Sequence, residues 1–428
     1  YYFLLFIVIF IFVLKNIYLV FFIYWQQSLI KQITVNLSKR LMNYYIHENY
    51  SFHINKNSSE LFRNLTTGVN SFSSSITYTM SFLTECLIFI FLLILLLFIQ
   101  TKVILIILIV FGLPTMVIGY VIKVIVTKYG EQIVFFSGKS LKNLLQALNS
   151  FKEIKIFGKE KLFLKAYIYN ENQVQEIQKK SSFIKYLPKL IFEILLMVTI
   201  FGVFMFSYKD GGSVTSALSA MSITAIVSIR IIPSITKILF SLNSLKRNQA
   251  FVKIIENDLM NSQKIYSEIK PKPNKEYLFK KNIQFKNIQF NYENPNVDIF
   301  KDLNLQINKG DYIGIYGKSG SGKSTLIDIF LGLQKLGKGK ILIDNQELVL
   351  HNNKDWQSII GYVSQTIVML DDTIQKNITF EDDLSKIDEK RYEECIQKVE
   401  LKDFISELKS GSDTIIAEGG SKLSGGQR

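Results

Sequence analysis

The chain has 428 residues, of which 48% are hydrophobic and 13% aromatic, and it carries a formal net charge of +14. This apolar content excludes an intrinsically disordered protein, and only two cysteines in the whole chain exclude a disulfide-stapled secreted domain. The positive charge fits either a nucleic acid or an anionic membrane surface as partner. Cys86 and Cys395 look unpaired, which fits a reducing cytosol.

Five apolar stretches are long enough to cross a lipid bilayer, which requires ~20 mostly apolar residues. One of them contains the run 89–98, in which no residue is polar. The alternative is a set of buried helices in a water-soluble core, but such cores use less continuous apolar sequence. We therefore predict five membrane spans at Tyr1–Trp25, Met80–Ile99, Val103–Val126, Phe183–Phe206 and Ala217–Phe240.

Basic residues gather in the two long connections, 26–79 and 127–182, whereas the short connections carry only Lys102 and Lys209. Because Lys and Arg mark the cytosolic side of a membrane protein, the long connections are predicted to be cytosolic. The charge therefore follows a membrane surface, and nucleic-acid binding is disfavoured. Five spans with a cytosolic end predict one further helix upstream, and we expect the sequence to be a fragment at both ends.

The long connections have helix-like apolar spacing over Leu29–Tyr50 and Ser137–Tyr169. We predict that the spanning helices continue out of the membrane and that short turns join them in pairs. The alternative is two solvated loops. The predicted turns are His53–Asn64, in which Ser58 or Ser59 caps a helix, and Lys155–Lys165.

The composition changes after Phe251. The segment Asn261–Lys275 contains Pro271 and Pro273 among many polar residues, as is typical of a linker. From Leu278 onward, short β-type runs alternate with helical segments. The sequence thus predicts an all-α transmembrane bundle over 1–260, a linker over 261–277 and an α/β domain over 278–428.

The strongest local signal is the segment 317–324, whose sequence GKSGSGKS matches the phosphate-binding pattern G-x-x-x-x-G-K-[ST]. A buried strand is predicted before it at Tyr312–Tyr316, and a helix after it at Thr325–Leu331. Glycines let backbone N–H groups turn toward phosphate oxygens, and the helix N-terminus adds partial positive charge. Lys323 is predicted to reach the β- and γ-phosphates and Ser324 to hold Mg²⁺. The predicted nucleotide contacts are Gly317, Ser319, Gly320, Ser321, Gly322, Lys323, Ser324 and Thr325.

Two other segments mimic nucleotide motifs. The sequence NKGD at 308–311 resembles a guanine-reading motif, but it precedes the phosphate-binding loop, whereas GTPases carry theirs after it. The run Ile341–Asp344 resembles a strand that ends in a metal-binding Asp, but Asn345 follows it instead of Glu. We interpret the first as chance and the second as an ordinary strand.

The segment Leu423-Ser424-Gly425-Gly426-Gln427 resembles the signature sequence of ABC transporter ATPases. Gln365, after a predicted strand at Ile359–Ser364, matches the family's Q-loop glutamine, and Tyr292 matches the aromatic residue that stacks on adenine. Glu418-Gly419-Gly420 lies where exporters carry a short motif that faces the membrane domain. With membrane helices in front, the whole chain resembles a type IV ABC exporter half-transporter. Three segments look most similar to bacterial lipid-linked oligosaccharide flippases: Asn57–Asn64, Phe151–Lys159 and Arg230–Lys237.

The resemblance implies a pair of half-transporters, expected to be a homodimer, whose ATP-binding domains close head to tail on two ATP molecules. Lys323 and Gln365 would then act in catalysis, and Ser324 and Gln365 would hold Mg²⁺. ATP on one copy would be contacted by the other copy's Ser424, Gly425, Gly426 and Gln427. Closure would move the two cytosolic turns as coupling helices and would open the helices outward. The family's hydrolytic glutamate and switch histidine have no counterpart here, so we expect residues 1–428 alone not to turn over ATP.

Charged side chains inside spans are costly and usually face a cavity or a partner. In the last span, polar side chains recur at helical spacing and form one stripe, made of Ser219, Ser222, Arg230, Ser234, Lys237 and Ser241. Our hypothesis is that the stripe lines a translocation path and that Arg230 and Lys237 meet an anionic head group. In the alternative, Arg230 pairs with Glu193 and Lys237 extends to the cytosolic interface.

The sequence therefore predicts an ATP-driven exporter or flippase in the bacterial cytoplasmic membrane, with its ATPase domain in the cytosol. The expected substrate is amphipathic, a lipid-linked oligosaccharide or another lipid. The alternatives are a multidrug or peptide exporter and an ATP-gated channel or regulator.

Overall fold

The computed structural model describes residues 2–99, 101–209, 214–268, 279–292, 298–348, 354–365, 367–416 and 423–428. It contains two compact units, Tyr1–Asn352 and Asn353–Arg428. This division falls inside the predicted ATP-binding domain. The domain boundaries given above remain predictions.

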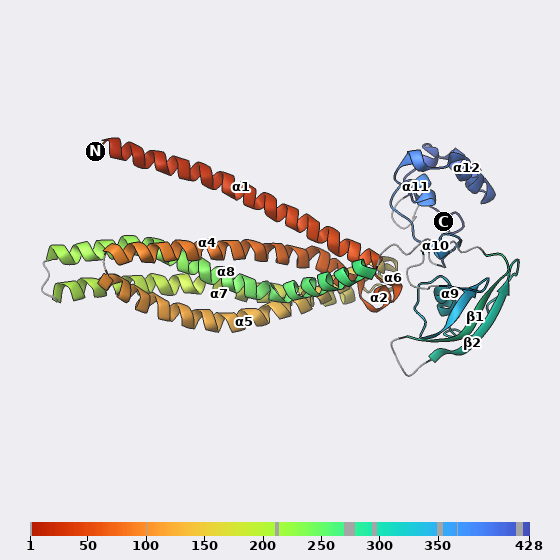
Figure 1. The fold of residues 1–428 in the computed structure, drawn as a ribbon, viewed down its shortest axis with the longest axis horizontal. Helices are drawn as coiled ribbons and strands as arrows, with labels where there is room; N and C mark the ends of the chain where they lie inside the picture. The colour runs from red at the N-terminus through yellow and green to blue at the C-terminus, as the bar shows by residue number, and fades with distance from the viewer. Residues whose placement is uncertain are drawn as a thin grey trace. The chain divides into compact units, whose positions relative to one another are not determined.

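Five long helices carry the predicted spans (Figure 1): α1 (Tyr2–His47), α4 (Val69–Ile99), α5 (Thr101–Asn149), α7 (Glu160–Lys209) and α8 (Val214–Glu268). Each contains a window long and apolar enough to cross a membrane, as predicted. At 1.5 Å per residue, the 46 residues of α1 extend for about 69 Å, more than twice the ~30 Å hydrocarbon thickness of a bilayer. The predicted continuation of the spanning helices beyond the membrane is therefore confirmed, and solvated loops are excluded there.

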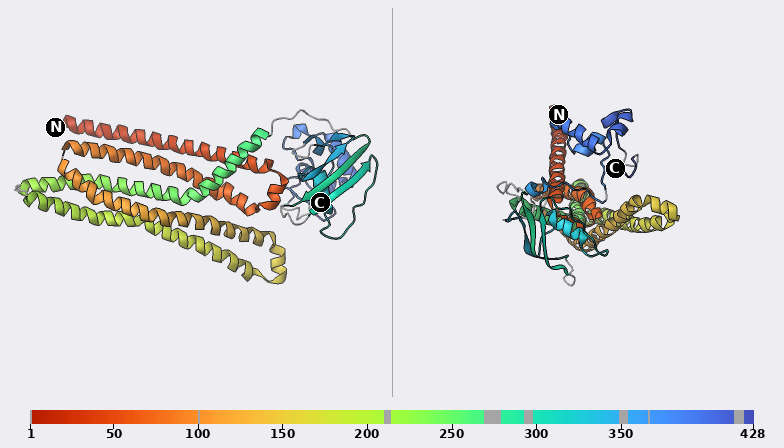
Figure 2. Two further views of the ribbon diagram at one scale, coloured as in Figure 1. Left: turned by 60° about the horizontal axis from the view of Figure 1, so that its bottom comes forward. Right: turned by 90° about the vertical axis from the view of Figure 1, so that its right-hand side faces the viewer.

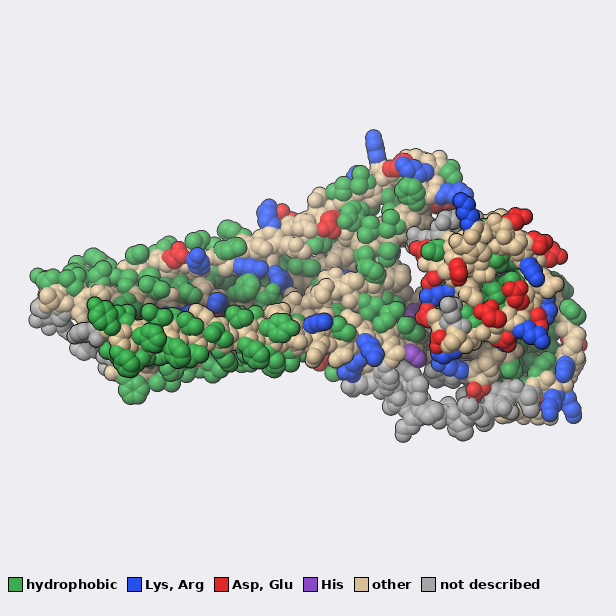
Figure 3. All heavy atoms as spheres, turned by 90° about the horizontal axis from the view of Figure 1, so that it is seen from above, with side chains coloured by type: hydrophobic (Ala, Val, Ile, Leu, Met, Phe, Trp, Pro, Cys, Tyr) green, Lys and Arg blue, Asp and Glu red, His purple; other side chains and the backbone are tan. Residues whose placement is uncertain are grey.

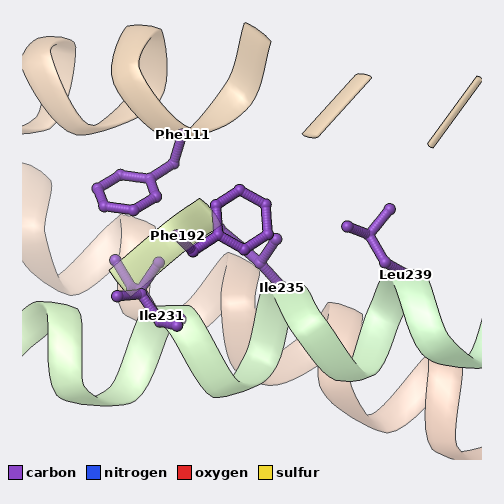
Figure 4. Close-up of a cluster of buried hydrophobic side chains, with 6 residues drawn as sticks. Phe111, Phe192, Ile231, Ile235 and Leu239 are labelled. Carbon is purple, nitrogen blue, oxygen red and sulfur yellow. The ribbon is translucent and has the colours of Figure 1, made fainter. Parts of the chain in front are cut away.

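On the face seen in Figure 3, many hydrophobic side chains (green) cover the helices over the spans. In α1, the large hydrophobic side chains between Tyr2 and Trp25 are all exposed, which suits a lipid environment. The helices α5, α7 and α8 meet around Phe111, Phe192 and Ile231, each at most 2% exposed. Figure 4 shows these side chains pointing toward one another, with Ile235 and Leu239 continuing the contact along α8.

The first of the two turns predicted to be cytosolic contains α2 (Tyr50–Asn55), α3 (Ser58–Arg63) and a π-helical turn, η1 (Asn64–Gly68). The helix cap differs from the prediction, because Asn57 caps α3 instead of Ser58 or Ser59. Its side-chain oxygen accepts the backbone N–H of Ser59 at 3.0 Å and the Ser59 hydroxyl at 2.7 Å. Asn is as good a cap as Ser, and here it precedes the first helical residue.

The second cytosolic turn lies earlier than the predicted Lys155–Lys165. It consists of α6 (Phe151–Phe157), which ends at Gly158 with φ +59°, and α7 begins at Glu160. Glycine adopts this left-handed conformation without steric cost and so ends the helix there. The left view of Figure 2 shows α5 and α7 as two long arms joined by this turn.

The last of the five long helices, α8, extends beyond the end predicted for the transmembrane bundle. Helix α8 runs to Glu268, so the first part of the predicted linker, residues 261–268, is helical. This stretch contains neither Gly nor Pro, and the first helix breaker is Pro271. Residues 269–278 lie outside the described residues.

Gly130 allows α5 and α8 to approach closely, and replacing it with Ala tests this contact. A Cβ atom at this position would overlap the backbone carbonyl of Arg247 on α8, and a backbone group cannot move aside as a flexible side chain can. We expect Gly130→Ala to destabilise the protein by about 1–3 kcal/mol, as overpacking does. Gly112→Ala, in the same helix, is the matched control, because a Cβ there meets nothing within 4 Å. Thermal unfolding in detergent should separate the two variants, and equal midpoints would contradict the prediction.

The sheet of the described residues has four antiparallel strands in the order β2-β1-β3-β4. The strands are β1 (Asn282–Asn291), β2 (Asp298–Asn308), β3 (Lys338–Ile343) and β4 (Gln346–Glu347). Helix α9 (Lys323–Phe330) packs on it through Phe330, whose ring stacks on Phe285 of β1 at 6.2 Å. The strand predicted at Ile341–Asp344 is thus confirmed as part of β3, and the Asp344 carboxylate accepts the backbone N–H groups of Lys281 and Asn282.

Two predicted strands are wrong. The segments Tyr312–Tyr316 and Ile359–Ser364 have no strand conformation, and most of their large side chains are exposed. A strand that is apolar on both faces needs neighbours that pair with its backbone and cover its faces. Among the described residues, neither segment belongs to the sheet or to an isolated bridge. Helix α9 confirms the helix predicted at Thr325–Leu331.

The second unit is built from short helices: α10 (Lys354–Gln357), α11 (Ile374–Thr379), α12 (Glu389–Lys398) and α13 (Lys402–Glu407). Its core consists of side chains that are at most 6% exposed, namely Ile374, Tyr392, Ile396, Ile405 and Ile416. Thr373 caps α11, and Asp388 caps α12. The segment 423–428 adjoins this core through Leu423.

Candidate functional site

The phosphate-binding loop lies between residue 316 and α9. Gly320 and Gly322 have φ angles of +80° and +89°, which glycine adopts freely and other residues rarely do. At Gly322 a Cβ would also collide with the Ile299 side chain. The glycines at these two positions are therefore required by the backbone, and the loop leads directly into α9 at Lys323.

Lys323 is folded across this loop. Its Nζ donates to the carbonyl oxygens of Gly317 at 2.8 Å and Lys318 at 2.9 Å. The ammonium group is thus held against the backbone at the start of the loop, and its own residue is the first of the eight-residue helix α9. A positive charge there adds to the partial positive charge of the helix end, so the site favours an anion.

Tyr292 lies beside the same helix. Its hydroxyl is 3.0 Å from the Thr325 hydroxyl, and its ring packs edge-on against Phe290 with centroids 5.1 Å apart. The ring is 39% exposed, so it has a face available for stacking on a base. The structure therefore places Tyr292 against Thr325, in the first turn of the helix that begins at Lys323, and the assignment of these residues to a nucleotide remains a prediction.

The donor set fits ATP with Mg²⁺. The Ser324 side chain is exposed beside Lys323, and a hydroxyl oxygen is a suitable Mg²⁺ ligand. Within the described ranges, no cluster of three or more His, Cys, Asp or Glu side chains could hold a metal ion. Burial raises the pKa of the Asp328 carboxyl, which lies further along α9.

The signature segment has the geometry of a helix cap. The backbone N–H of Ser424 donates to the Gln427 side chain at 2.9 Å, and the N–H of Gln427 is 3.3 Å from the Ser424 hydroxyl oxygen. This reciprocal pair is a capping box, here formed by Ser and Gln three residues apart. It fixes the Ser424 side chain and leaves Gly425 and Gly426 exposed.

Two further sets of predicted positions are Gln365 and the segment Glu418-Gly419-Gly420. Gln365 is exposed in a segment without regular secondary structure. Glu418, Gly419 and Gly420 lie outside the described residues. Gln365 and the signature segment belong to the second unit, whereas the phosphate-binding loop belongs to the first.

An apolar groove of about 240 Å³ lies beside the signature segment in the second unit. Its walls come from α11 and α13, with Ile378, Phe404 and Leu423 among the apolar side chains. Phe380 on its edge is 72% exposed and has φ +52°, which is uncommon for an aromatic residue.

In the helical bundle, Lys237 pairs with Glu85, a partner that the sequence did not suggest. Its Nζ is 2.7 Å from Glu85 Oε1, and the Ser234 hydroxyl donates to Glu85 Oε2 at 2.8 Å. The Glu85 side chain is only 9% exposed and the Lys237 side chain 61%. The carboxylate is therefore enclosed between α4 and α8, and the ammonium group is accessible.

The alternative pairing of Arg230 with Glu193 is not present. Glu193 pairs with Lys189 on its own helix at 3.8 Å, and Arg230 is exposed. The polar stripe of α8 is divided, because Ser234 and Ser241 are 1% exposed whereas Ser222 is exposed. A helix that packs on several neighbours buries part of such a stripe, which spacing alone does not show.

A buried polar cluster beside the first turn was also missed. It joins Tyr45 of α1, Asn64 of η1 and Asp258 of α8. Asp258 is 4% exposed. Asp258 stands next to Glu256 and Asn257 in the sequence, so no local pattern marks its carboxylate as buried or identifies its partners.

The comparisons with known proteins agree with this architecture. The family described as "ABC transporter transmembrane region" matches residues 1–232, and the family described as "ABC transporter" matches residues 300–428. A solved structure of a bacterial Atm1-family ABC exporter with ATP bound has the same fold, with a TM-score of 0.72 and 20% identity, over 94% of this chain and 69% of that chain.

Two curated relatives are similar in sequence. The ATP-dependent lipid A-core flippase of Wigglesworthia glossinidia brevipalpis is 30% identical over 293 residues, 66% of this chain and 48% of the relative. The leukotoxin translocation ATP-binding protein LktB of Mannheimia haemolytica is 40% identical over 149 residues, 35% of this chain and 21% of the relative. The chain thus spans less than half the length of these relatives. The chain belongs to the ABC transporter family, with a transmembrane region that precedes an ATP-binding domain.

Proposed function

We propose that the full protein is an ATP-driven exporter or flippase that moves an amphipathic substrate across the cytoplasmic membrane as a dimer of identical half-transporters. The observation that carries this proposal is the fusion of membrane-crossing helices with a phosphate-binding loop and an ABC signature in one chain. The similarity to the lipid A-core flippase extends over 66% of the chain and favours a lipid-linked substrate.

ATP supplies the free energy when its binding favours one conformation of the dimer over another. In this chain, Lys323 would pair with the β- and γ-phosphates, Ser324 and Gln365 would hold Mg²⁺, and Tyr292 would stack on the base. The contacts of Lys323 with Gly317 and Lys318 hold its ammonium group at the loop in advance. Ser424, fixed by its capping pair with Gln427, would face the phosphates bound by the partner copy.

For the substrate path we propose Arg230 and Lys237 of α8, with Glu193 of α7, which lies inside the predicted span Phe183–Phe206. Arg230 and Lys237 are exposed cations seven residues apart, and therefore on one face of α8. A cation in a membrane span attracts an anionic group, so a phosphate-bearing lipid head group fits this face. Because Glu85 already neutralises Lys237, Arg230 is the stronger determinant.

The test is a flipping assay in proteoliposomes with the full-length dimer. A fluorescent lipid-linked oligosaccharide and a neutral lipid of the same chain length serve as probes. We expect ATP-dependent movement of the anionic probe, reduced about tenfold in Arg230→Ala, which corresponds to the loss of one charge-assisted contact. Lys123→Ala, an exposed Lys of another span, is the matched control. Equal transport by Arg230→Ala and the wild type would remove Arg230 from the path.

A second candidate is protein or peptide export, which the leukotoxin translocation relative favours. That similarity covers 35% of this chain, about half the share matched by the flippase. Stimulation of ATP hydrolysis by an unfolded polypeptide, and not by the lipid probe, would favour it.

A further inference from the structure

A buried carboxylate joins the last membrane helix to the first cytosolic turn. Asp258 Oδ2 accepts the Tyr45 hydroxyl at 2.6 Å and the Asn64 amide at 3.2 Å. Asp258 Oδ1 lies 3.5 Å from Lys56 Nζ, which belongs to the link between α2 and α3. Three separate parts of the chain, α1, α8 and residues 56–64, thus meet at one side chain.

The turn itself is held in an uncommon conformation. The π-helical turn η1 begins at Asn64, and π-helical turns are rare and frequently occur at functional sites. Arg63 donates to the Val134 carbonyl of α5 at 3.2 Å and to Asn64 Oδ1 at 3.2 Å. Gly68, at the end of η1, allows Ile255 of α8 to pack against the backbone. Contacts from α5 and α8 therefore fix the turn on both sides.

The cluster is polar although it adjoins an apolar contact. Leu41, Val69 and Ile255 pack nearby and are at most 1% exposed. Enclosing a carboxylate is unfavourable unless its partners are in place, so apolar residues would have held these helices together more simply. The carboxylate makes the contact specific, because its hydrogen bonds form in only one relative arrangement of α1, α8 and the turn.

The protonation state of Tyr45 supports its hydrogen bond to Asp258. Burial and the nearby Asp258 carboxylate raise the pKa of Tyr45 above its ordinary value. The Tyr45 phenol consequently stays protonated and remains a hydrogen-bond donor to Asp258. Helix α8 is the helix that precedes the ATP-binding domain in the chain. A side chain that fixes α8 to the turn therefore links two elements, α8 and the turn, that must move together in an exporter.

We infer that Asp258 is a positioning residue for energy coupling, which holds the turn formed by residues 56–68 in register with α8 through Tyr45 and Asn64. This inference rests on the proposed exporter function. Movement of α8 would carry the turn with it, and the turn would carry α1 and α5 through Tyr45 and Arg63. Loss of the cluster would leave ATP hydrolysis intact and uncouple it from the substrate.

The test uses the full-length dimer in proteoliposomes with Asp258→Asn and Tyr45→Phe. Tyr44→Phe is the comparison variant, because Tyr44 is equally buried on the same helix and its hydroxyl interacts with Glu48 and Asn261 instead of hydrogen-bonding to Asp258. We expect basal ATP hydrolysis within about twofold of the wild type and a transport-to-hydrolysis ratio reduced at least about fivefold, the lower limit for loss of a coupling between sites. The double variant should lose no more than either single variant, since both remove one cluster.

A second measurement does not depend on a known substrate. Hydrogen exchange of the amides in 57–68 is recorded with and without ATP, and we expect ATP to change it in the wild type and in Tyr44→Phe but to change it less than half as much in Asp258→Asn and Tyr45→Phe. An equal change in all four proteins, or a transport ratio unaffected by both test variants, would overturn the inference. Absence of transport by the wild type, with the exchange pattern as expected, would instead contradict the exporter function.

Discussion

Replacement of Lys323 by Ala in the full-length dimer is expected to lower ATP hydrolysis on the order of 10²-fold, the size of effect seen when one preorganised charge-stabilising donor is removed. Lys323 is the residue whose ammonium group the loop holds through the carbonyls of Gly317 and Lys318. Without it, the negative charge on the transferred phosphoryl group would lose the Lys323 ammonium group, while the loop backbone and the helix end would remain.

The matched control is Lys318→Ala in the same loop. The Lys318 backbone carbonyl takes part in the contact with Lys323, and that carbonyl survives the substitution. We expect Lys318→Ala to hydrolyse ATP within a few-fold of the wild type, and phosphate release in proteoliposomes measures both variants. If Lys323→Ala hydrolysed ATP as fast as Lys318→Ala, the assignment of the nucleotide site to this loop would be wrong.

The membrane helices and their cytosolic continuation could be predicted because their signal is local. An apolar run of about 20 residues needs no knowledge of its partners to identify it, and helix spacing in Leu29–Tyr50 is visible within one segment. The phosphate-binding loop and α9 are equally local, because Gly320 and Gly322 are required by the backbone conformation of the loop itself.

The failures involve partners that are distant in sequence. Tyr312–Tyr316 has the composition of a strand, but a strand forms only where another strand pairs with it. The partner of Lys237 is Glu85, which is 152 positions away, and Asp258 binds Tyr45 across 213 positions. One sequence offers many acidic residues for each Lys, so helix packing decides which pair forms. The cap at Asn57 was missed for a smaller reason, because Asn and Ser are nearly equivalent caps.

The ion pair between Glu85 of α4 and Lys237 of α8 should stabilise the folded protein, and two substitutions can test whether the cost of losing it comes from an unpaired Glu85 carboxylate. Lys237→Leu leaves the Glu85 carboxylate, whose side chain is 9% exposed, with Ser234 as its remaining hydrogen-bond donor. Breaking a buried pair from one side typically costs about 3–5 kcal/mol. Because the Lys237 side chain is 61% exposed, we expect a loss of unfolding free energy near the lower limit, about 3 kcal/mol.

The double variant Glu85→Gln/Lys237→Leu should recover at least half of that loss, because a neutral amide is far less costly to enclose than an unpaired carboxylate. The control is Lys189→Leu, which breaks an exposed pair with Glu193 and should cost less than about 1 kcal/mol. Reversible unfolding in detergent micelles measures all three. A double variant as unstable as Lys237→Leu would show that the charge of Glu85 is not the cause, and that Lys237 acts through its packing on α4 instead.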